Sequence, residues 1–99
     1  MNSLQTYLEG KSVLITGASE GVGLAITETL SSFRMKMGLL ARSEENLKKT
    51  AARANSAGSE AFILQADLRD QKAVEDAARK FEETEGIPDF LINNAGIGL

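Results

Sequence analysis

The sequence predicts an α/β fold, in which helices cover both faces of a parallel sheet. Short β-rich runs alternate with longer amphipathic runs from Ser12 onward, and this alternation is typical of βαβ units. A glycine-rich segment at 16–23 joins the first apolar run to the first amphipathic run. The chain has 99 residues and is 42% apolar, which is enough for one small core. We therefore expect a single domain over residues 1–99.

The first strand and the first helix are expected at 12–16 and 21–33. The strand holds the apolar run Val13-Leu14-Ile15. Apolar residues then recur at helical spacing and should form one stripe against the sheet, made of Val22, Ile26, Leu30 and Phe33. Glu28 and Ser32 are expected to face water.

The second strand is expected at 35–41, and a helix should follow it at once. Ser43 offers a side-chain oxygen as the helix cap, directly ahead of Glu44 and Glu45. Carboxylates stabilise the positive end of the helix dipole, so this is a favourable helix start. We expect the helix to end near Gly58.

The third strand is expected at 60–66, and Asp70 should cap the helix that follows. The buried stripe of this helix is predicted to consist of Val74, Ala77, Ala78 and Phe81. Gly86 should end the helix, and a fourth strand is expected at 89–93.

Right-handed crossovers and short connections favour the strand order 3-2-1-4 for such a chain. The direction of winding then reverses between the first and the fourth strand, and ligands bind at the carboxyl ends of strands at such a point. The glycine segment and residues 93–96 follow these two strands. We expect both segments to line one crevice.

The segment Thr16-Gly17-Ala18-Ser19-Glu20-Gly21-Val22-Gly23 has the layout of a nucleotide phosphate site between a strand and a helix. Glycines permit positive φ and let the backbone N–H groups of 17–23 approach a pyrophosphate. Ser19 has no His or Lys partner in sequence reach, so its hydroxyl is interpreted as a phosphate donor. The alternative is a purely structural turn. The predicted phosphate-site residues are Gly17, Ser19, Glu20, Gly21, Val22 and Gly23.

Four segments together resemble the short-chain dehydrogenase/reductase family: Leu8-Glu9-Gly10-Lys11, the glycine segment, Asp67-Leu68 and Asn93-Asn94-Ala95-Gly96. The resemblance implies a Rossmann-like fold and an oxidoreductase that uses NAD or NADP. It implies that the glycine segment holds the cofactor phosphates and that Asp67 and Leu68 contact the adenine. It also implies that Asn94, Ala95 and Gly96 lie against the ribose, and that Asn93 braces the central strands.

Asp67 has a second interpretation, because an aspartate can also cap the turn that leads to the third helix. Asn93 and Asn94 could equally tie two strand ends together through their amides. Both alternatives stay open from the sequence.

Arg42 favours NADP over NAD as the cofactor. It directly follows the second strand, where an acidic residue would bind the ribose 2′-OH of NAD and an arginine would pair with the 2′-phosphate of NADP. Alternatively, Arg42 pairs on the surface with Glu44 or Glu45. Glu20 argues against NADP, since a carboxylate pointing inward would repel a phosphate.

By resemblance, the chemistry of the family uses a Ser on the fifth strand and a Tyr-x-x-x-Lys pair on the next helix. Both would lie beyond residue 99, so we expect a cofactor-binding part truncated after the fourth strand, with no catalytic residue. Tyr7 and Lys11 match the pair's spacing. They precede the first strand, however, whose five residues separate them from the crevice by about 16 Å.

Composition excludes several other functions. The chain has no Cys and no His, so we expect no metal site. Its net charge is −3 with dispersed basic residues, which argues against nucleic-acid partners, and no apolar stretch approaches the roughly 20 residues of a membrane helix. We expect a cytoplasmic protein whose partner is a nicotinamide dinucleotide. The alternative function is a non-catalytic half-domain that self-associates through its exposed fourth strand.

Overall fold

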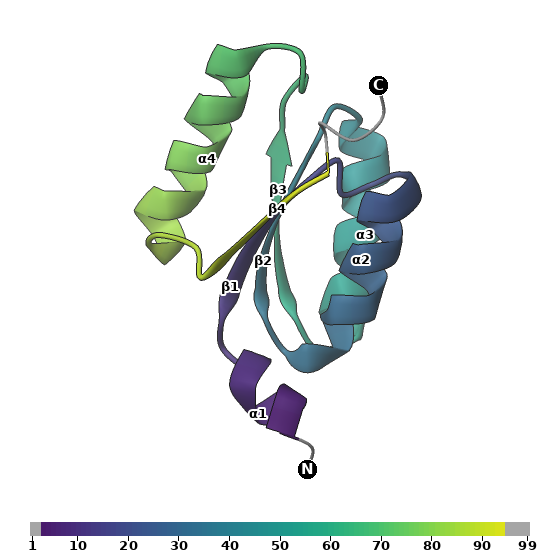
Figure 1. The fold of residues 1–99 in the computed structure, drawn as a ribbon. Coiled ribbons are helices and arrows are strands. Elements are labelled where there is room, and N and C mark those ends of the chain that lie inside the picture. Colours follow the sequence, from purple (N-terminus) through teal and green to yellow (C-terminus); the bar gives the residue numbers. More distant parts are fainter. Residues whose placement is uncertain (1–2, 95–99) are drawn as a thin grey trace.

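The computed structural model describes residues 3–94 (Figure 1). From the amino end, the elements are α1 (Ser3–Leu8), β1 (Ser12–Thr16), α2 (Gly21–Leu30), the 3-10 turn η1 (Ser31–Phe33), β2 (Lys36–Ala41), α3 (Glu44–Ser56), β3 (Glu60–Gln65), α4 (Gln71–Glu85) and β4 (Phe90–Asn93). All strands and long helices expected from the sequence are present, and their bounds differ by at most two residues except at the end of α2. The first helix is shorter than expected, because its last turn tightens into η1.

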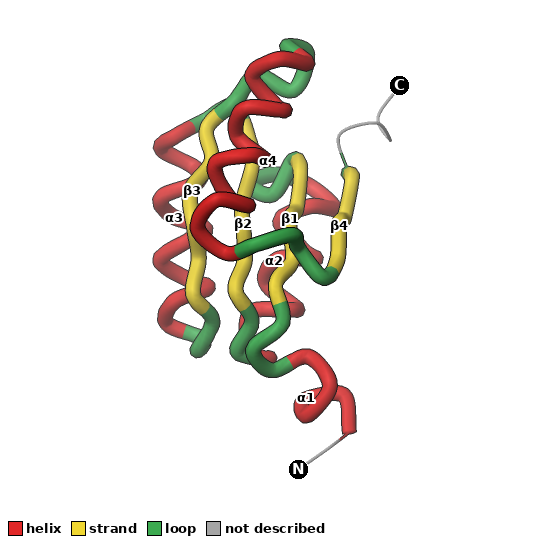
Figure 2. The backbone as a smooth tube through the Cα atoms, turned by 90° about the vertical axis from the view of Figure 1, so that its left-hand side faces the viewer, coloured by secondary structure: helices red, strands yellow, loops and turns green. Residues whose placement is uncertain are grey.

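The strands form one parallel sheet in the order β3-β2-β1-β4, as predicted. Figures 1 and 2 show α2 and α3 on one face of the sheet and α4 on the other. Because every strand runs in the same direction, the turns that follow β1, β2, β3 and β4 all lie along one edge. This edge carries the segments that the sequence marks as a site.

Each face of the sheet has its own core. On the α2 and α3 side, Val13, Ile15 and Leu39 are fully buried against Leu47 and Ala54. On the opposite side, a smaller cluster packs α4 onto the sheet and contains Leu14, Leu40, Leu64, Ala77 and Phe81. Successive side chains of a strand point to opposite faces of the sheet, so strands covered by helices on both sides bury both sets.

The packing of α2 corrects one expectation. Val22 is 59% exposed, so it does not belong to the buried stripe, whereas Ile26, Leu30 and Phe33 are partly buried against the core as expected. The most deeply buried residues of this segment are Gly23, Thr27 and Ser31. These residues are small, and the hydroxyls of Thr27 and Ser31 donate to the carbonyls of Gly23 and Thr27 at 2.8 and 2.6 Å. The helix therefore lies closer to the loop after β1 than a stripe of large side chains would permit.

The predicted starts of α3 and α4 and the predicted end of α4 are confirmed by local contacts. Ser43 Oγ accepts a hydrogen bond from the N–H of Asn46 at 3.2 Å, and Asp70 Oδ1 accepts one from the N–H of Ala73 at 3.2 Å. Gly86 ends α4 with a φ of +78°, which favours glycine.

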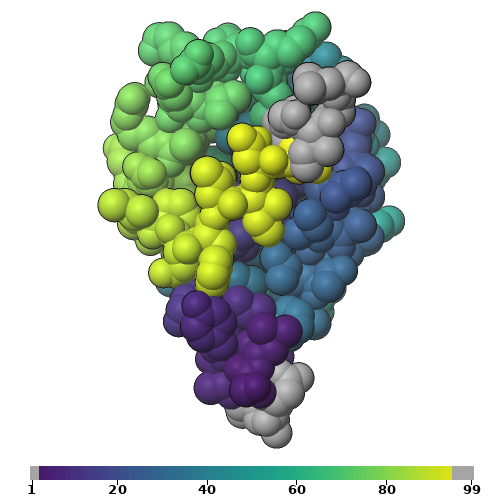
Figure 3. Space-filling model, in the orientation of Figure 1, coloured from purple at the N-terminus to yellow at the C-terminus, as the bar shows by residue number. Residues whose placement is uncertain are grey.

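Helix α1 was not expected from the sequence. It is short and lies beyond the amino edge of the sheet, at the lower tip of the molecule in Figure 3. Tyr7 contacts the ring of Phe90 edge-on, with centroids 6.2 Å apart, and the Lys11 ammonium lies 5.2 Å from the Tyr7 ring. None of the helices in the described part of the chain combines the length and apolar character needed to cross a bilayer.

Candidate functional site

A cleft of about 500 Å³ opens at the carboxyl edge of the sheet. Segments that follow all four strands line it, so residues distant in sequence converge there as expected. The predicted site residues among its lining are Gly17, Ser19, Glu20, Gly21, Val22, Arg42, Asp67, Leu68 and Asn94. Gly23 lies beneath the loop, and Ala95 and Gly96 are outside the described residues. Contact of these residues with a cofactor stays a prediction.

The glycine loop has the backbone geometry that the sequence indicates. Gly17 and Gly21 have φ values of +68° and +52°, in the left-handed region that side chains disfavour. Gly23 permits a close approach of α2 to the loop, because a Cβ there would overlap the carbonyl oxygen of Gly17. The three glycines thus have two different roles, turning the chain and packing the helix.

The loop offers fewer free amides than expected. The N–H groups of Gly17 and Ala18 both donate to the carbonyl of Leu40, at 2.7 and 3.3 Å, so they are not available to a ligand. The N–H groups of 19–23 donate to no acceptor within residues 3–94, as is usual for the first turn of a helix. A phosphate-binding interpretation is therefore limited to 19–23.

Two side chains of the loop also face the cleft. Ser19 is buried, and its hydroxyl makes no hydrogen bond with any of the described residues, which leaves it free to donate to a ligand. Glu20 is exposed and occupies the N-cap position of α2 without making a capping hydrogen bond. The loop therefore presents one neutral donor and one carboxylate.

Arg42 follows β2 and reaches the cleft with an exposed side chain. Within residues 3–94 it forms no ion pair, and Glu45 instead pairs with Lys49 at 3.7 Å. The surface pairing that the sequence left open for Arg42 is thus not found. Its guanidinium is available to an anion in the cleft.

Asp67 is engaged by Arg69, a residue that the sequence reasoning missed. Asp67 Oδ1 accepts from the backbone N–H and the Nε of Arg69 at 2.9 and 3.1 Å, and Oδ2 accepts from Nη2 at 2.9 Å. The carbonyl of Asp67 also accepts from the N–H of Asp70 at 2.9 Å. Asp67 therefore organises the turn before α4, as the alternative interpretation held. The sequence signal that could have revealed this pair is the positively charged Arg69 two residues after Asp67.

These hydrogen bonds from Arg69 lower the pKa of the Asp67 carboxyl from 3.8 to about 2. A depressed folded-state pKa stabilises the fold above pH 3.8 and loses that contribution as the pH falls toward 2. We expect Arg69→Ala to raise the Asp67 pKa toward 3.8, as followed by the carboxyl carbon shift in an NMR pH titration. Part of the lowering should persist, because the backbone N–H of residue 69 and the charge of Arg42 remain. An unchanged pKa in this variant would mean that Arg69 does not hold the carboxylate in solution.

The two asparagines after β4 have separate roles. Asn93 Oδ1 accepts from the Thr16 hydroxyl at 2.9 Å and so ties β4 to β1, which confirms its expected bracing role. Asn94 is half-buried, and its Nδ2 lies 3.0 Å from where a Cβ on Gly17 would stand. Asn94 therefore closes the cleft beside the glycine loop.

Comparisons with known proteins show which family the chain resembles. The family model described as short chain dehydrogenase matches residues 11–99. A fatty acyl-CoA reductase of Acinetobacter baylyi is 37% identical over 89 residues, which are 90% of this chain and 30% of that protein. The oxidoreductase UcpA of Salmonella typhimurium is 39% identical over 90 residues, covering 91% of this chain and 34% of its own. The chain thus spans about a third of the length of these relatives.

Solved structures show the same similarity. L-sorbose reductase from Gluconobacter frateurii, complexed with NADPH and L-sorbose, superposes with a TM-score of 0.84 at 30% identity. The match covers 93% of this chain and 35% of the reductase. A metagenomic short-chain oxidoreductase in complex with NADP gives a TM-score of 0.83 at 36% identity, covering 92% and 41% of the two chains.

Proposed function

The chain belongs to the short-chain dehydrogenase family, and we propose that it provides the coenzyme site of an NADP-dependent oxidoreductase. The observation that carries this proposal is the convergence of the glycine loop, Arg42, Asp67 and Asn94 on one cleft. Bound NADP would supply hydride transfer between its nicotinamide ring and a carbonyl or alcohol carbon.

The residues present fit a dinucleotide diphosphate. The N–H groups of 19–23 have no acceptor among the described residues, and they lie at the start of a helix, where anions are stabilised. The Ser19 hydroxyl adds a side-chain donor at the same place. Gly21 brings no Cβ that would separate this backbone from the phosphates.

Arg42 supports NADP as the coenzyme. Its guanidinium lines the cleft without an ion-pair partner in residues 3–94, and a guanidinium can bind a phosphate through two parallel hydrogen bonds. Two similar solved structures are complexes with NADPH and NADP. In the proposed arrangement Asp67 and Leu68 border the adenine, and Asn94 borders the ribose.

Calorimetric titration of the chain with NADPH and with NADH tests the proposed function. We expect both to bind with 1:1 stoichiometry and NADPH to bind more tightly. Tighter binding of NADH would overturn the assignment of NADP, and binding of neither would overturn the coenzyme site itself.

Glu20 opposes NADP binding in this proposal. It lines the same cleft as Arg42, and a carboxylate there repels the 2′-phosphate. We expect Glu20→Gln to raise the affinity for NADPH by about two- to fivefold and to change that for NADH by less. Glu28→Gln is the matched control, because Glu28 is an exposed carboxylate of the same helix that pairs with Arg53 instead. Equal gains in the two variants would contradict a local role for Glu20.

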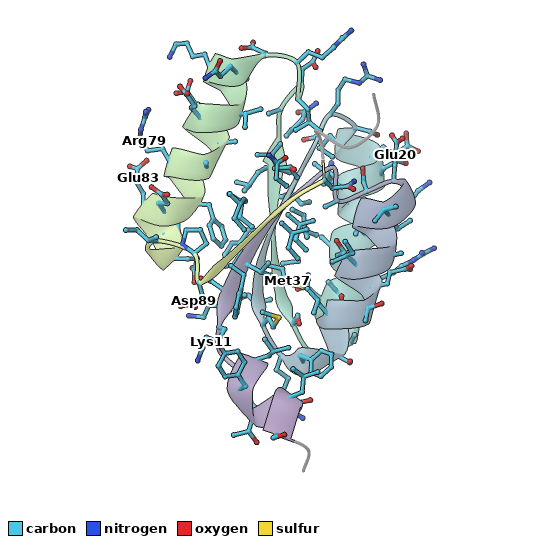
Figure 4. All side chains as sticks on the ribbon, viewed as in Figure 1. Lys11, Glu20, Met37, Arg79, Glu83 and Asp89 are labelled. Carbon is cyan, nitrogen blue, oxygen red and sulfur yellow. The ribbon has the colours of Figure 1, made fainter. Side chains whose placement is uncertain are left out.

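We expect the chain on its own to bind the coenzyme without turning it over. Tyr7 and Lys11 have the spacing of a proton-donating pair, yet they lie at the amino edge of the sheet, and Figure 4 shows Lys11 at the opposite end from Glu20. Proton transfer requires a donor within hydrogen-bond reach of the reacting oxygen. Oxidation of NADPH by carbonyl compounds that falls in a Tyr7→Phe variant would contradict this expectation.

Assembly through β4 is a second candidate function, which the similarity to oxidoreductases does not favour and which rests on one observation. Within residues 3–94, β4 pairs only with β1, and Leu91 is 63% exposed beside a hollow of about 630 Å³ against α4. Figure 3 shows β4 on the front surface of the molecule. Light scattering coupled to size-exclusion chromatography tests this candidate. A monodisperse monomer would contradict assembly through β4.

A further inference from the structure

The cleft contains charged groups of both signs close together. Arg42 follows β2 and Asp67 follows β3, and these strands are neighbours, with Ala41 paired to Gln65 and the N–H of Ala66 bonded to the carbonyl of Ala41 at 3.0 Å. Arg69 lines the same cleft two residues beyond Asp67. One carboxylate therefore lies near two guanidinium groups.

The Asp67 carboxylate pairs with Arg69 and not with Arg42. Both oxygens of Asp67 accept side-chain hydrogen bonds from Arg69, at 3.1 and 2.9 Å, and Oδ1 also accepts the Arg69 backbone N–H at 2.9 Å. Arg42 has no ion pair in the described part of the chain, although the charge of Arg42 contributes to the lowered pKa of Asp67. Without Arg69, Asp67 would have Arg42 as its nearest alternative cation in the cleft lining.

We propose that Arg69 is a positioning residue that sets coenzyme preference through Asp67. By holding both carboxylate oxygens, it prevents Asp67 from pairing with Arg42, and it leaves the Arg42 guanidinium open to a 2′-phosphate. This inference rests on the proposed NADP function. A paired Asp67 can still accept one further hydrogen bond at Oδ2, so the pairing does not exclude a contact with adenine.

The test is the ratio of NADH to NADPH dissociation constants in a set of variants. Any contact of Asp67 with adenine is common to both coenzymes and cancels in this ratio. We expect Arg69→Ala to lower the ratio by about two- to fivefold, the range for releasing one exposed carboxylate. Asp67→Asn with Arg69→Ala should return it to within about twofold of the wild type. Arg42→Ala with Arg69→Ala should match Arg42→Ala alone, because Arg69 acts through Arg42.

Arg79→Ala is the charge-matched control. Arg79 is an exposed arginine of α4 that pairs with Asp76 at 3.2 Å, and Figure 4 shows it on the opposite side of the molecule from Glu20. Its loss should leave the ratio unchanged.

Two results would overturn the inference. The first is an Arg69→Ala effect on the ratio that is equally large in the Asp67→Asn background, which would mean that Arg69 binds the phosphate itself. If Arg69→Ala does not change the ratio, Arg69 has no role in coenzyme preference. A wild-type chain that binds neither coenzyme, or prefers NADH, instead overturns the proposed function and this inference with it.

Discussion

Replacing Gly23 with alanine is expected to weaken coenzyme binding by about tenfold or more and to lower the free energy of unfolding by roughly 1–3 kcal/mol. The added Cβ would overlap the Gly17 carbonyl oxygen and lie 2.9 Å from Asn94 Nδ2. Gly17 cannot move aside freely, because its N–H is bonded to the carbonyl of Leu40 at 2.7 Å. The start of α2 must therefore shift, and the free N–H groups of 19–23 shift with it.

Urea unfolding and calorimetric titration with NADPH measure the two effects. Gly10→Ala is the control, since Gly10 has a φ of +81° and open space around it, at the other end of β1. This control should lose about 1–2 kcal/mol of stability through backbone strain alone and keep its coenzyme affinity. A Gly23→Ala variant that binds NADPH as tightly as the wild type would show that close packing of the loop is not needed.

Replacing Arg42 with alanine is expected to weaken NADPH binding by about tenfold to a hundredfold and to leave NADH binding nearly unchanged. The expected range is that of a charge-assisted hydrogen-bonded contact, and only NADPH carries the 2′-phosphate that would make it. Competition between the two coenzymes, followed by nicotinamide fluorescence, gives both affinities in one experiment.

Arg53→Ala serves as the control for the loss of one positive charge. Arg53 is exposed on α3 and pairs with Glu28 at 2.8 Å, away from the cleft lining. Its replacement should change neither affinity. An equal loss of NADPH and NADH affinity in Arg42→Ala would assign Arg42 to a part that the two coenzymes share, and the choice of NADP would be wrong.

Most of the fold could be predicted because its signals are local. The caps at Ser43 and Asp70 and the stop at Gly86 depend on residues within one turn of a helix boundary. The strand order follows from the handedness of crossovers, which the chain cannot easily violate. Helix α1 was missed because six residues carry too little periodicity to distinguish a helix from a loop.

The site was only partly predictable, for reasons of packing and competition. Val22 fits the apolar stripe by spacing, but it is exposed, while Gly23, Thr27 and Ser31 are the buried residues where α2 approaches the loop. The loss of the Gly17 and Ala18 amides depends on the carbonyl of Leu40, which comes from another strand. Asp67 could pair with Arg42 or with Arg69, since both line the same cleft, and sequence spacing alone does not decide between them.

Amide NMR of the chain during titration with NADPH tests most directly whether the helix start after β1 binds the coenzyme. We expect the largest shift changes at the N–H groups of 19–23, with further changes at Arg42 and Asp67. The amides of Gly17 and Ala18 should remain protected from exchange throughout, because both stay bonded to Leu40. Saturation with NADPH that leaves 19–23 unperturbed, with the changes gathered instead along α4 and β4, would contradict the account.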